Sequence, residues 1–283
     1  MDLDKLFDSF LREKKYLSNL SDRTLRYLKG CLKSYKRISS GLPNKQKLNE
    51  WIILLRESGV SASAINSYIR GFNSFLTWLH ENEHTPERLK LKPLKEPQKV
   101  LKVFSDDQLK SLLSWKPAGF YEQRLYALIV FIIDTGCRID ECLSLKRSGV
   151  DIDNFLVTVR GKGNKERIIP ISLECRRVLY RFLDRHNFDL VFPTKQGAKY
   201  SYRNSVRDFK DLCKQLGIMD VRTSWHTLRH GFAINHVRQG GDVFSLQRMM
   251  GHSSLDVTKR YVNLTEDDLK MVHKKTSILS RLK

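Results

Sequence analysis

The sequence predicts a mainly α-helical protein with one small β-hairpin, arranged as two domains. A chain of 283 residues, 41% of them hydrophobic, is long enough to form two cores. Apolar residues recur at helical spacing through the first eighty residues. Only the stretch NFLVTVRGKGNKERIIPI has two β-rich runs around a glycine-containing turn. We expect an N-terminal helical domain over 1–85, a linker over 86–102 and a second domain over 103–283.

The N-terminal domain is predicted to be a bundle of four amphipathic helices. The first helix carries its apolar stripe from Leu3 to Leu11, and the second follows a possible Ser21 cap. The third ends at Gly59, and the fourth begins after Ser61 or Ser63. The stretch HTPERLKLKPLKEPQKVLKVF over 84–104 contains three prolines and many lysines, which is typical of a stiff linker.

The second domain is predicted to be helical on both sides of the hairpin. SDDQLKSLLSW reads as a capped helix, RLYALIVFIIDTG as a buried helix that stops at Gly136, and RIDECLSLKRSGV as a further helix. Helices resume after residue 172, interrupted by DLVFPTKQGAKYS. A capping pattern of Thr265 and Asp268 starts a last helix over about 265–283.

The charge of the chain indicates a polyanionic partner. Lys and Arg number 51 against 31 Asp and Glu, a formal net charge of +20. No apolar run approaches the eighteen or so residues of a membrane span, and no amphipathic anchor stands out. The five cysteines show no CxxC or metal-like spacing, and the N-terminus lacks the layout of a signal peptide. We therefore expect a cytoplasmic protein that binds nucleic acid rather than a membrane.

Two short stretches near the C-terminus, TSWHTLRHGFA and MMGHSSLDVTKRYVNLT, gather residues of a kind that a core does not need. A lone tyrosine is usually a packing residue, but Tyr261 stands close to several cationic groups. A phenol can attack a phosphodiester when its neighbours activate it. Arginine suits the reacting phosphate because its planar fork binds two oxygens. Arg138 and Arg229 offer such forks, and His226 shares a helix face with Arg229 at i, i+3.

The predicted hairpin turn GKGNKER adds a lysine, Lys162, between two glycines. A lysine there could protonate a leaving 5′-oxygen, or the hairpin could simply contact the DNA backbone. No metal site is predicted, because HTLRH lacks the glutamate of HExxH. No GxSxG signature of a serine hydrolase is present either.

These motifs give the second domain a family resemblance. TGCRIDECLSL, VRGKGNKERIIPI, HTLRHGFA and MMGHSSLDVTKRY resemble, in this order, the catalytic domain of the tyrosine site-specific recombinases, the phage integrase family. The N-terminal bundle resembles the family's SAM-like core-DNA-binding domain. Together the two resemblances cover nearly the whole chain. MMGH in place of Leu-Gly-His and RIDE in place of Arg-x-Ser-Glu are conservative departures.

The resemblance implies a catalytic set of Arg138, Lys162, His226, Arg229, His252 and Tyr261. The two arginines would hold the scissile phosphate and Lys162 would act as the general acid. His226 would assist proton transfer or hold the phosphate.

The remaining roles are also implied by the resemblance. His252 would hydrogen-bond the phosphate, and Tyr261 would attack it to form a 3′-phosphotyrosyl link. Glu141 matches an acidic position that supports the first arginine, and His230 matches a frequent position without a catalytic role.

Members of the family act as tetramers on two DNA sites, exchange strands through a Holliday junction and need no cofactor or metal. Their C-terminal helix usually docks on a neighbouring protomer, which would give 265–283 a purpose. The resemblance thus implies a partner in double-stranded DNA with an inverted-repeat-like site, and no small-molecule substrate. A simple Xer-like member could resolve chromosome or plasmid dimers, or integrate and excise a mobile element.

Two alternatives stay open at the level of sequence. The chain could be an accessory or regulatory DNA-binding protein that kept the fold, or an enzyme like a type IB topoisomerase or telomere resolvase. Sequence choice must come from base contacts and DNA bending. The predicted DNA contacts lie on the fourth N-terminal helix, at the hairpin and on the helix over 201–217: Asn66, Arg70, Asn73, Lys165, Arg203, Asn204 and Arg207.

Overall fold

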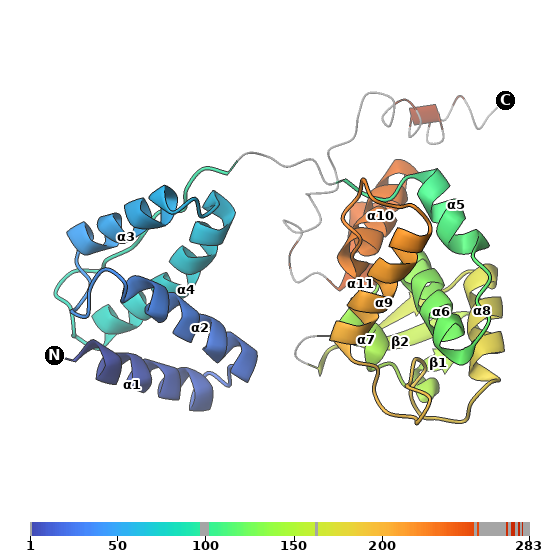
Figure 1. Cartoon of the computed structure of the whole chain (residues 1–283), viewed down its shortest axis with the longest axis horizontal. Helices are drawn as coiled ribbons and strands as arrows, with labels where there is room; N and C mark the ends of the chain where they lie inside the picture. The colour runs from blue at the N-terminus through green and yellow to red at the C-terminus, as the bar shows by residue number, and fades with distance from the viewer. Residues whose placement is uncertain are drawn as a thin grey trace. The chain divides into compact units, whose positions relative to one another are not determined.

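The computed structural model divides the chain into two compact units, Met1–Lys99 and Val100–Lys283 (Figure 1). It describes residues 2–96, 102–161 and 164–251, together with the single positions 254, 270, 273–274, 277 and 279. Each unit is built around its own large hydrophobic core. The prediction of a mainly helical protein with a small antiparallel sheet is confirmed.

Within 2–96, the N-terminal unit is a bundle of the helices α1 (Leu3–Tyr16), α2 (Asp22–Tyr35), α3 (Lys45–Glu57) and α4 (Ala62–Glu81). Each helix begins at a polar residue whose side chain accepts a backbone N–H of the first turn, and these caps are Asp2, Ser21, Asn44 and Ser61. The core is aromatic: Phe10, Trp51, Phe72 and Phe75 are fully buried, and their rings meet at tilted or edge-on angles.

The segment after α4 belongs to this unit, although the sequence suggested a linker from residue 86 onward. Leu91 is buried in the N-terminal core. The Asn66 side chain donates to the Leu94 carbonyl at 2.9 Å and accepts from the Leu94 N–H at 2.7 Å. Asn73 makes the same pair of bonds to Leu91, both at 2.9 Å. These two asparagines, predicted as DNA contacts, thus hold the chain against α4, whereas Arg70 is exposed.

The second unit is organised around α6 (Phe120–Thr135), whose residues from Ala127 to Ile132 are all buried. A helix that is apolar all round must lie inside its domain. Five other helices of the described residues pack against it: α5 (Asp106–Ser114), α7 (Ile139–Leu143), α8 (Leu173–Leu183), α9 (Tyr202–Gln215) and α10 (Trp225–Arg238). The remaining described helix, α11 (Val243–Met250), packs on α10 through a small cluster of its own. The chain reverses after α6 at Gly136, which adopts a left-handed φ of 62°.

The predicted helix over RIDECLSLKRSGV is much shorter than expected, because α7 has only 5 residues. The backbone beyond it pairs with a distant strand-like segment instead. The Leu145 carbonyl accepts from the N–H of Val191 at 2.9 Å, and the Arg147 N–H donates to the Asp189 carbonyl at 2.6 Å. A short 3-10 turn, Arg147–Gly149, then leads into the sheet. These long-range bonds replace the helical ones, a competition that local sequence does not reveal.

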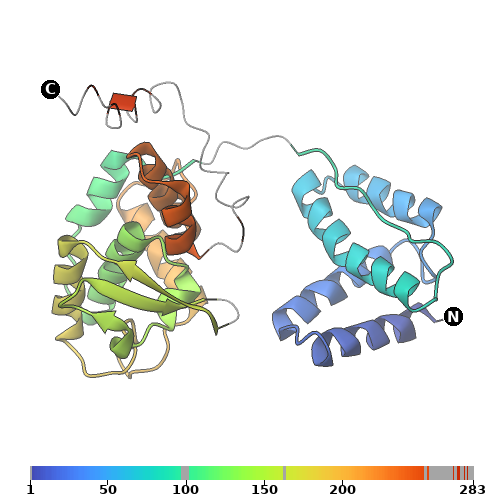
Figure 2. The same cartoon turned by 180° about the vertical axis from the view of Figure 1, so that it is seen from behind.

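The hairpin is confirmed as part of a three-stranded antiparallel sheet in the order β1-β2-β3. Its strands are β1 (Val150–Asp151), β2 (Leu156–Arg160) and β3 (Glu166–Pro170), seen side by side in Figure 2. In the register Val157↔Ile169, the side chains of Val157, Val159 and Ile169 are buried. Ile168, on the opposite face, is 62% exposed. One face therefore packs on the helices.

Some predicted elements lie outside the described residues. They include the hairpin tip at Lys162 and Gly163, and most of the predicted terminal helix over 265–283. None of the helices that the structure describes has the length and apolar character needed to cross a membrane. All five cysteines are buried and unpaired.

Candidate active site

The turn between α6 and α7 fixes the first predicted catalytic arginine. Arg138 is the residue just before α7, and its backbone N–H donates to Glu141 Oε2 at 2.8 Å. Its side chain also reaches Glu141, with Nη1 at 3.0 Å from Oε1. This pairing of a helix start with an acidic third residue is a capping box, so the local sequence RIDE orients the guanidinium as it starts the helix. The Arg138 side chain remains 38% exposed.

The second arginine comes from the first half of α10 and is almost fully buried. The Ser224 side chain caps α10, which places Arg229 on the inward face with 2% exposure. Its Nη1 donates to the Gly136 carbonyl at 2.5 Å and its Nη2 to the Met250 carbonyl at 2.8 Å. Because Gly136 precedes Arg138 by two residues, the bond to Gly136 brings α10 against the turn that carries the first arginine.

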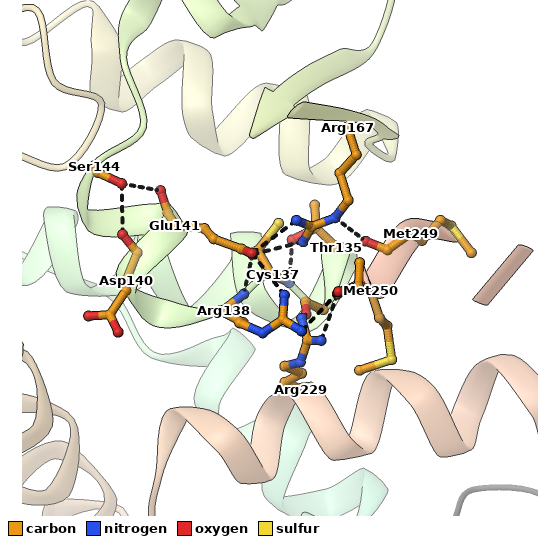
Figure 3. A network of polar contacts seen from close by, with 12 residues as sticks. Thr135, Cys137, Arg138, Asp140, Glu141, Ser144, Arg167, Arg229, Met249 and Met250 are labelled. Carbon is orange, nitrogen blue, oxygen red and sulfur yellow. Dashed lines mark hydrogen bonds and ion pairs between the residues drawn. The ribbon is translucent and has the colours of Figure 1, made fainter. Parts of the chain in front are cut away.

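The end of α11 is the third piece of the site (Figure 3). Arg138 Nη2 donates to the Gly251 carbonyl at 3.0 Å, next to the Met250 carbonyl that Arg229 uses. A third arginine, Arg167 of β3, donates its Nε–H to the Met249 carbonyl at 2.7 Å. Helices end with carbonyls that lack partners within the helix and with partial negative charge. The end of α11 therefore gathers cationic side chains from three different elements.

Glu141 is the acidic centre of this network, and its side chain is 4% exposed. Burial alone would raise the pKa of its carboxyl group. The hydrogen bonds and charge of Arg167, and then the bonds from Arg138, outweigh burial and lower the pKa below its ordinary value. The carboxylate is therefore charged at neutral pH, as a support for Arg138 requires.

His226 lies in the first turn of α10 with part of its surface exposed, and His230 lies one turn further along. Their ring centroids are 4.8 Å apart at an interplanar angle of 72°. Partial burial lowers the pKa of His226, and the charges of Arg229, Arg138 and Arg222 lower it further. A neutral imidazole can accept a proton or donate one hydrogen bond, which suits the predicted role beside a phosphate.

The structure brings together Arg138, Glu141, His226 and Arg229, four of the predicted site residues. Lys162, His252 and Tyr261 lie outside the described residues. Among the predicted DNA contacts, Arg203 and Asn204 on α9 and Lys165 after the hairpin tip are exposed.

The last of the predicted DNA contacts, on α9, is paired with a neighbouring carboxylate. Arg207 is exposed and paired with Asp208 at 3.0 Å. The described residues contain no group of three or more His, Cys, Asp or Glu side chains that could hold a metal ion.

Arg167 is the residue of this network that sequence reasoning missed. It lies on β3 on the same face as the buried Ile169, two residues away. The strand reads ERIIP, so the adjacent apolar residues Ile168 and Ile169 point to opposite faces of the sheet. From the sequence alone, either face could be the buried one. Alternation alone could not decide whether Glu166 or Arg167 points inward. The only available signal was an arginine beside apolar strand residues.

A family model supports the assignment that this geometry suggests. Residues 102–268 match the model of the phage integrase family. Since these residues make up more than half of the chain, the chain belongs to the phage integrase family.

Curated relatives agree with this assignment. Tyrosine recombinase XerD of Listeria monocytogenes is 30% identical over 274 residues, which cover 89% of both chains. Tyrosine recombinase XerA of Thermococcus kodakarensis is 28% identical over 272 residues, covering 94% of this chain and 93% of the relative. The predicted resemblance to Xer-like tyrosine recombinases, which are enzymes of site-specific DNA recombination, is confirmed.

Solved structures with low sequence identity show the same fold. The Tn1549 transposon integrase, in complex with a circular intermediate DNA, superposes with a TM-score of 0.80 at 19% identity and covers 97% of this chain and 99% of its own. The XerH site-specific recombinase bound to its palindromic difH substrate gives a TM-score of 0.75 at 18% identity, covering 96% and 84%. The fold thus extends across both units of the chain.

Proposed function

We propose that this chain cleaves and rejoins double-stranded DNA at a specific site, with Arg138 and Arg229 as the ligands of the scissile phosphate. The observation that carries the proposal is the convergence of these two side chains, from the start of α7 and from α10, on the neighbouring carbonyls of Gly251 and Met250. Two fixed guanidinium groups at one point suit the charge of a phosphoryl-transfer transition state. His226, on the same helix as Arg229, adds a group beside the two arginines whose lowered pKa favours the neutral imidazole.

In the proposed first step, the Tyr261 phenol oxygen attacks the scissile phosphorus. The new P–O bond joins the tyrosine to the 3′ end of the strand, and the bond to the 5′-oxygen breaks. Lys162 gives a proton to that oxygen, and neutral His226 takes up the proton that the phenol loses. His252 donates a hydrogen bond to the phosphate. Attack by a 5′-hydroxyl on the phosphotyrosine reverses the step and needs no cofactor, because the bond energy is conserved.

The assembly that goes with this chemistry is also part of the proposal. The relatives are named Xer recombinases, and a structural neighbour is bound to a palindromic DNA substrate. We infer that four copies of the chain act on two inverted-repeat sites in the cytoplasm, with the terminal segment 265–283 docked on a neighbouring copy. Exposed Arg70, Arg203 and Asn204 are proposed to contact the DNA.

Covalent trapping tests the reaction. The wild-type chain is incubated with nicked duplexes that cover the DNA flanking its gene, denatured in detergent, and the attached DNA is sequenced. We expect an adduct through a 3′-phosphate on Tyr261. The matched variant Tyr261→Phe differs by a single oxygen and should bind DNA normally without forming the adduct.

Other outcomes would point to other functions. An adduct that survives Tyr261→Phe would exclude this nucleophile. Relaxation of supercoiled plasmids of any sequence would indicate a topoisomerase. Specific binding without an adduct on the native flanking DNA would indicate a DNA-binding factor that kept the fold.

A further inference from the structure

The end of α11 accepts hydrogen bonds from an unusual set of side chains. Three successive carbonyls, of Met249, Met250 and Gly251, accept hydrogen bonds from Arg167, Arg229 and Arg138 in turn. Arg229 and Arg138 are the proposed phosphate ligands. The third arginine has no place in the reaction proposed above, although it is bonded into the same network (Figure 3).

Arg167 uses all three of its nitrogen atoms inside the protein. Nη1 and Nη2 donate to the two oxygens of Glu141 at 2.9 Å and 2.8 Å, and Nε donates to Met249 at 2.7 Å. Its side chain is only 12% exposed. A guanidinium held in this two-pronged way is rigid, and it is directed at Glu141 and α11 rather than at solvent. It is therefore poorly placed to bind DNA itself.

Glu141 links Arg167 to the proposed phosphate site. Each of its carboxylate oxygens accepts one bond from Arg167 and one from Arg138: Oε1 from the two Nη1 atoms, and Oε2 from Arg167 Nη2 and the Arg138 backbone N–H. If Arg167 were absent, Glu141 would be a buried carboxylate with half of these donors. It would then move toward solvent or take up a proton, and in either case the bond that orients Arg138 would weaken.

We propose that Arg167 is a positioning residue for DNA cleavage: it fixes Glu141, and through it the guanidinium of Arg138, against the end of α11. This inference rests on the proposed function. Lysine could not replace Arg167, because a single ammonium group cannot bond both oxygens of Glu141 and the Met249 carbonyl at once.

The first measurement is single-turnover formation of the covalent complex at saturating protein. Arg167→Gln should slow it by about 10- to 100-fold, since a small misplacement of a catalytic group has effects of that size. Arg167→Lys keeps the charge but should also be slow. Because Arg167 makes no direct phosphate contact in the proposed complex, the DNA affinity of both variants should stay within about threefold of the wild type. Arg160→Gln is the matched control: Arg160 lies on the neighbouring strand and is also paired with a glutamate, but it is 67% exposed. Its rate should be unchanged.

The second measurement separates positioning from a loss of folding. A methylphosphonate at the scissile position removes the phosphate charge that Arg138 is proposed to stabilise. If Arg167 acts through Arg138, the defect of Arg167→Gln shrinks on this substrate. In a double-mutant cycle, adding Arg167→Gln to Arg138→Ala should then lower the cleavage rate only slightly further. Equal defects on both substrates, with additive effects in the cycle, would overturn the proposal in favour of a structural role.

The two proposals fail in different ways. If the wild-type chain forms no adduct through Tyr261 on its native DNA, the proposed function fails, and the role of Arg167 with it. If the wild-type chain cleaves and the cleavage rate of Arg167→Gln lies within about threefold of the wild-type rate, only the role of Arg167 fails. A misplaced catalytic group would have a larger effect on the rate. If Arg167→Gln does not fold, the same comparison is made with Arg167→Lys.

Discussion

At the scale of single residues, Gly251 matters both for the backbone that ends α11 and for the arginine network, because its carbonyl accepts a bond from Arg138. Its φ of 61° is left-handed, and a Cβ added there would lie 3.0 Å from Arg167 Nη1. Gly251→Ala should therefore lower the free energy of unfolding by about 1–2 kcal/mol through the backbone alone, and should also slow cleavage by moving Arg167. Urea denaturation and covalent trapping measure the two effects.

Gly217 is the matched control for this prediction. It has a similar φ of 71°, but nothing lies within 4 Å of an added Cβ. Gly217→Ala should cost a comparable 1–2 kcal/mol, roughly, with an unchanged cleavage rate. Normal cleavage by Gly251→Ala would show that the network tolerates a displaced Arg167.

The lowered pKa of His226 predicts the acidic limb of the pH–rate profile. In the proposed mechanism the neutral imidazole takes up the proton of the tyrosine, so the cleavage rate should fall as the pH drops through the pKa of His226. Burial is the largest cause of the lowered pKa, followed by the charges of three arginines, among them Arg222. Arg222→Gln removes one of these cations, raises the pKa of His226 and should move the limb to higher pH. The limb should disappear in His226→Asn, and an identical limb in both variants would assign it to another group.

At the scale of elements, the docked segment after α4 offers a further test. The Asn66 amide is buried and bonded to Leu94 in both directions and to Glu96. Asn66→Ala would remove both bonds from the partly buried backbone of Leu94, which costs about 1–3 kcal/mol. Urea denaturation should show this loss, while DNA affinity under native conditions stays close to normal. Arg70→Ala should do the opposite, weakening DNA binding with little effect on unfolding.

The elements also show what the sequence could and could not predict. Helical spacing and caps such as Ser21 and Ser61 were sufficient for the N-terminal helices, because those signals are local. The extent of α7 was not predictable, since backbone pairing with residues 189–191 ends it. Nor was the docking of residues 86–96, which depends on two asparagines that look like surface residues in the sequence. At the site, the residue types predicted the chemistry, but the inward face of β3 was ambiguous.

At the scale of the whole molecule, the net charge of +20 predicts that DNA binding depends strongly on salt. Each phosphate that a basic side chain neutralises releases counterions, so affinity should fall linearly on a log–log plot against salt. For six to ten phosphate contacts, the loss between 50 and 200 mM salt is about 10³- to 10⁵-fold. Fluorescence anisotropy with a short duplex measures the slope. A shallow slope would mean that most of the basic residues face away from the DNA.

The buried network around Glu141 has a consequence for changing the specificity of this enzyme. Its arginines are bonded to the helix end and to the α6–α7 turn, so most changes to them would disturb both stability and chemistry. The outer face of α9, with exposed Arg203 and Asn204, makes no such demand, because the helix is anchored by its buried face at Phe209 and Leu212. If Arg203 and Asn204 contact the DNA as proposed, target preference can be redesigned along α9 without changing the residues of the reaction centre.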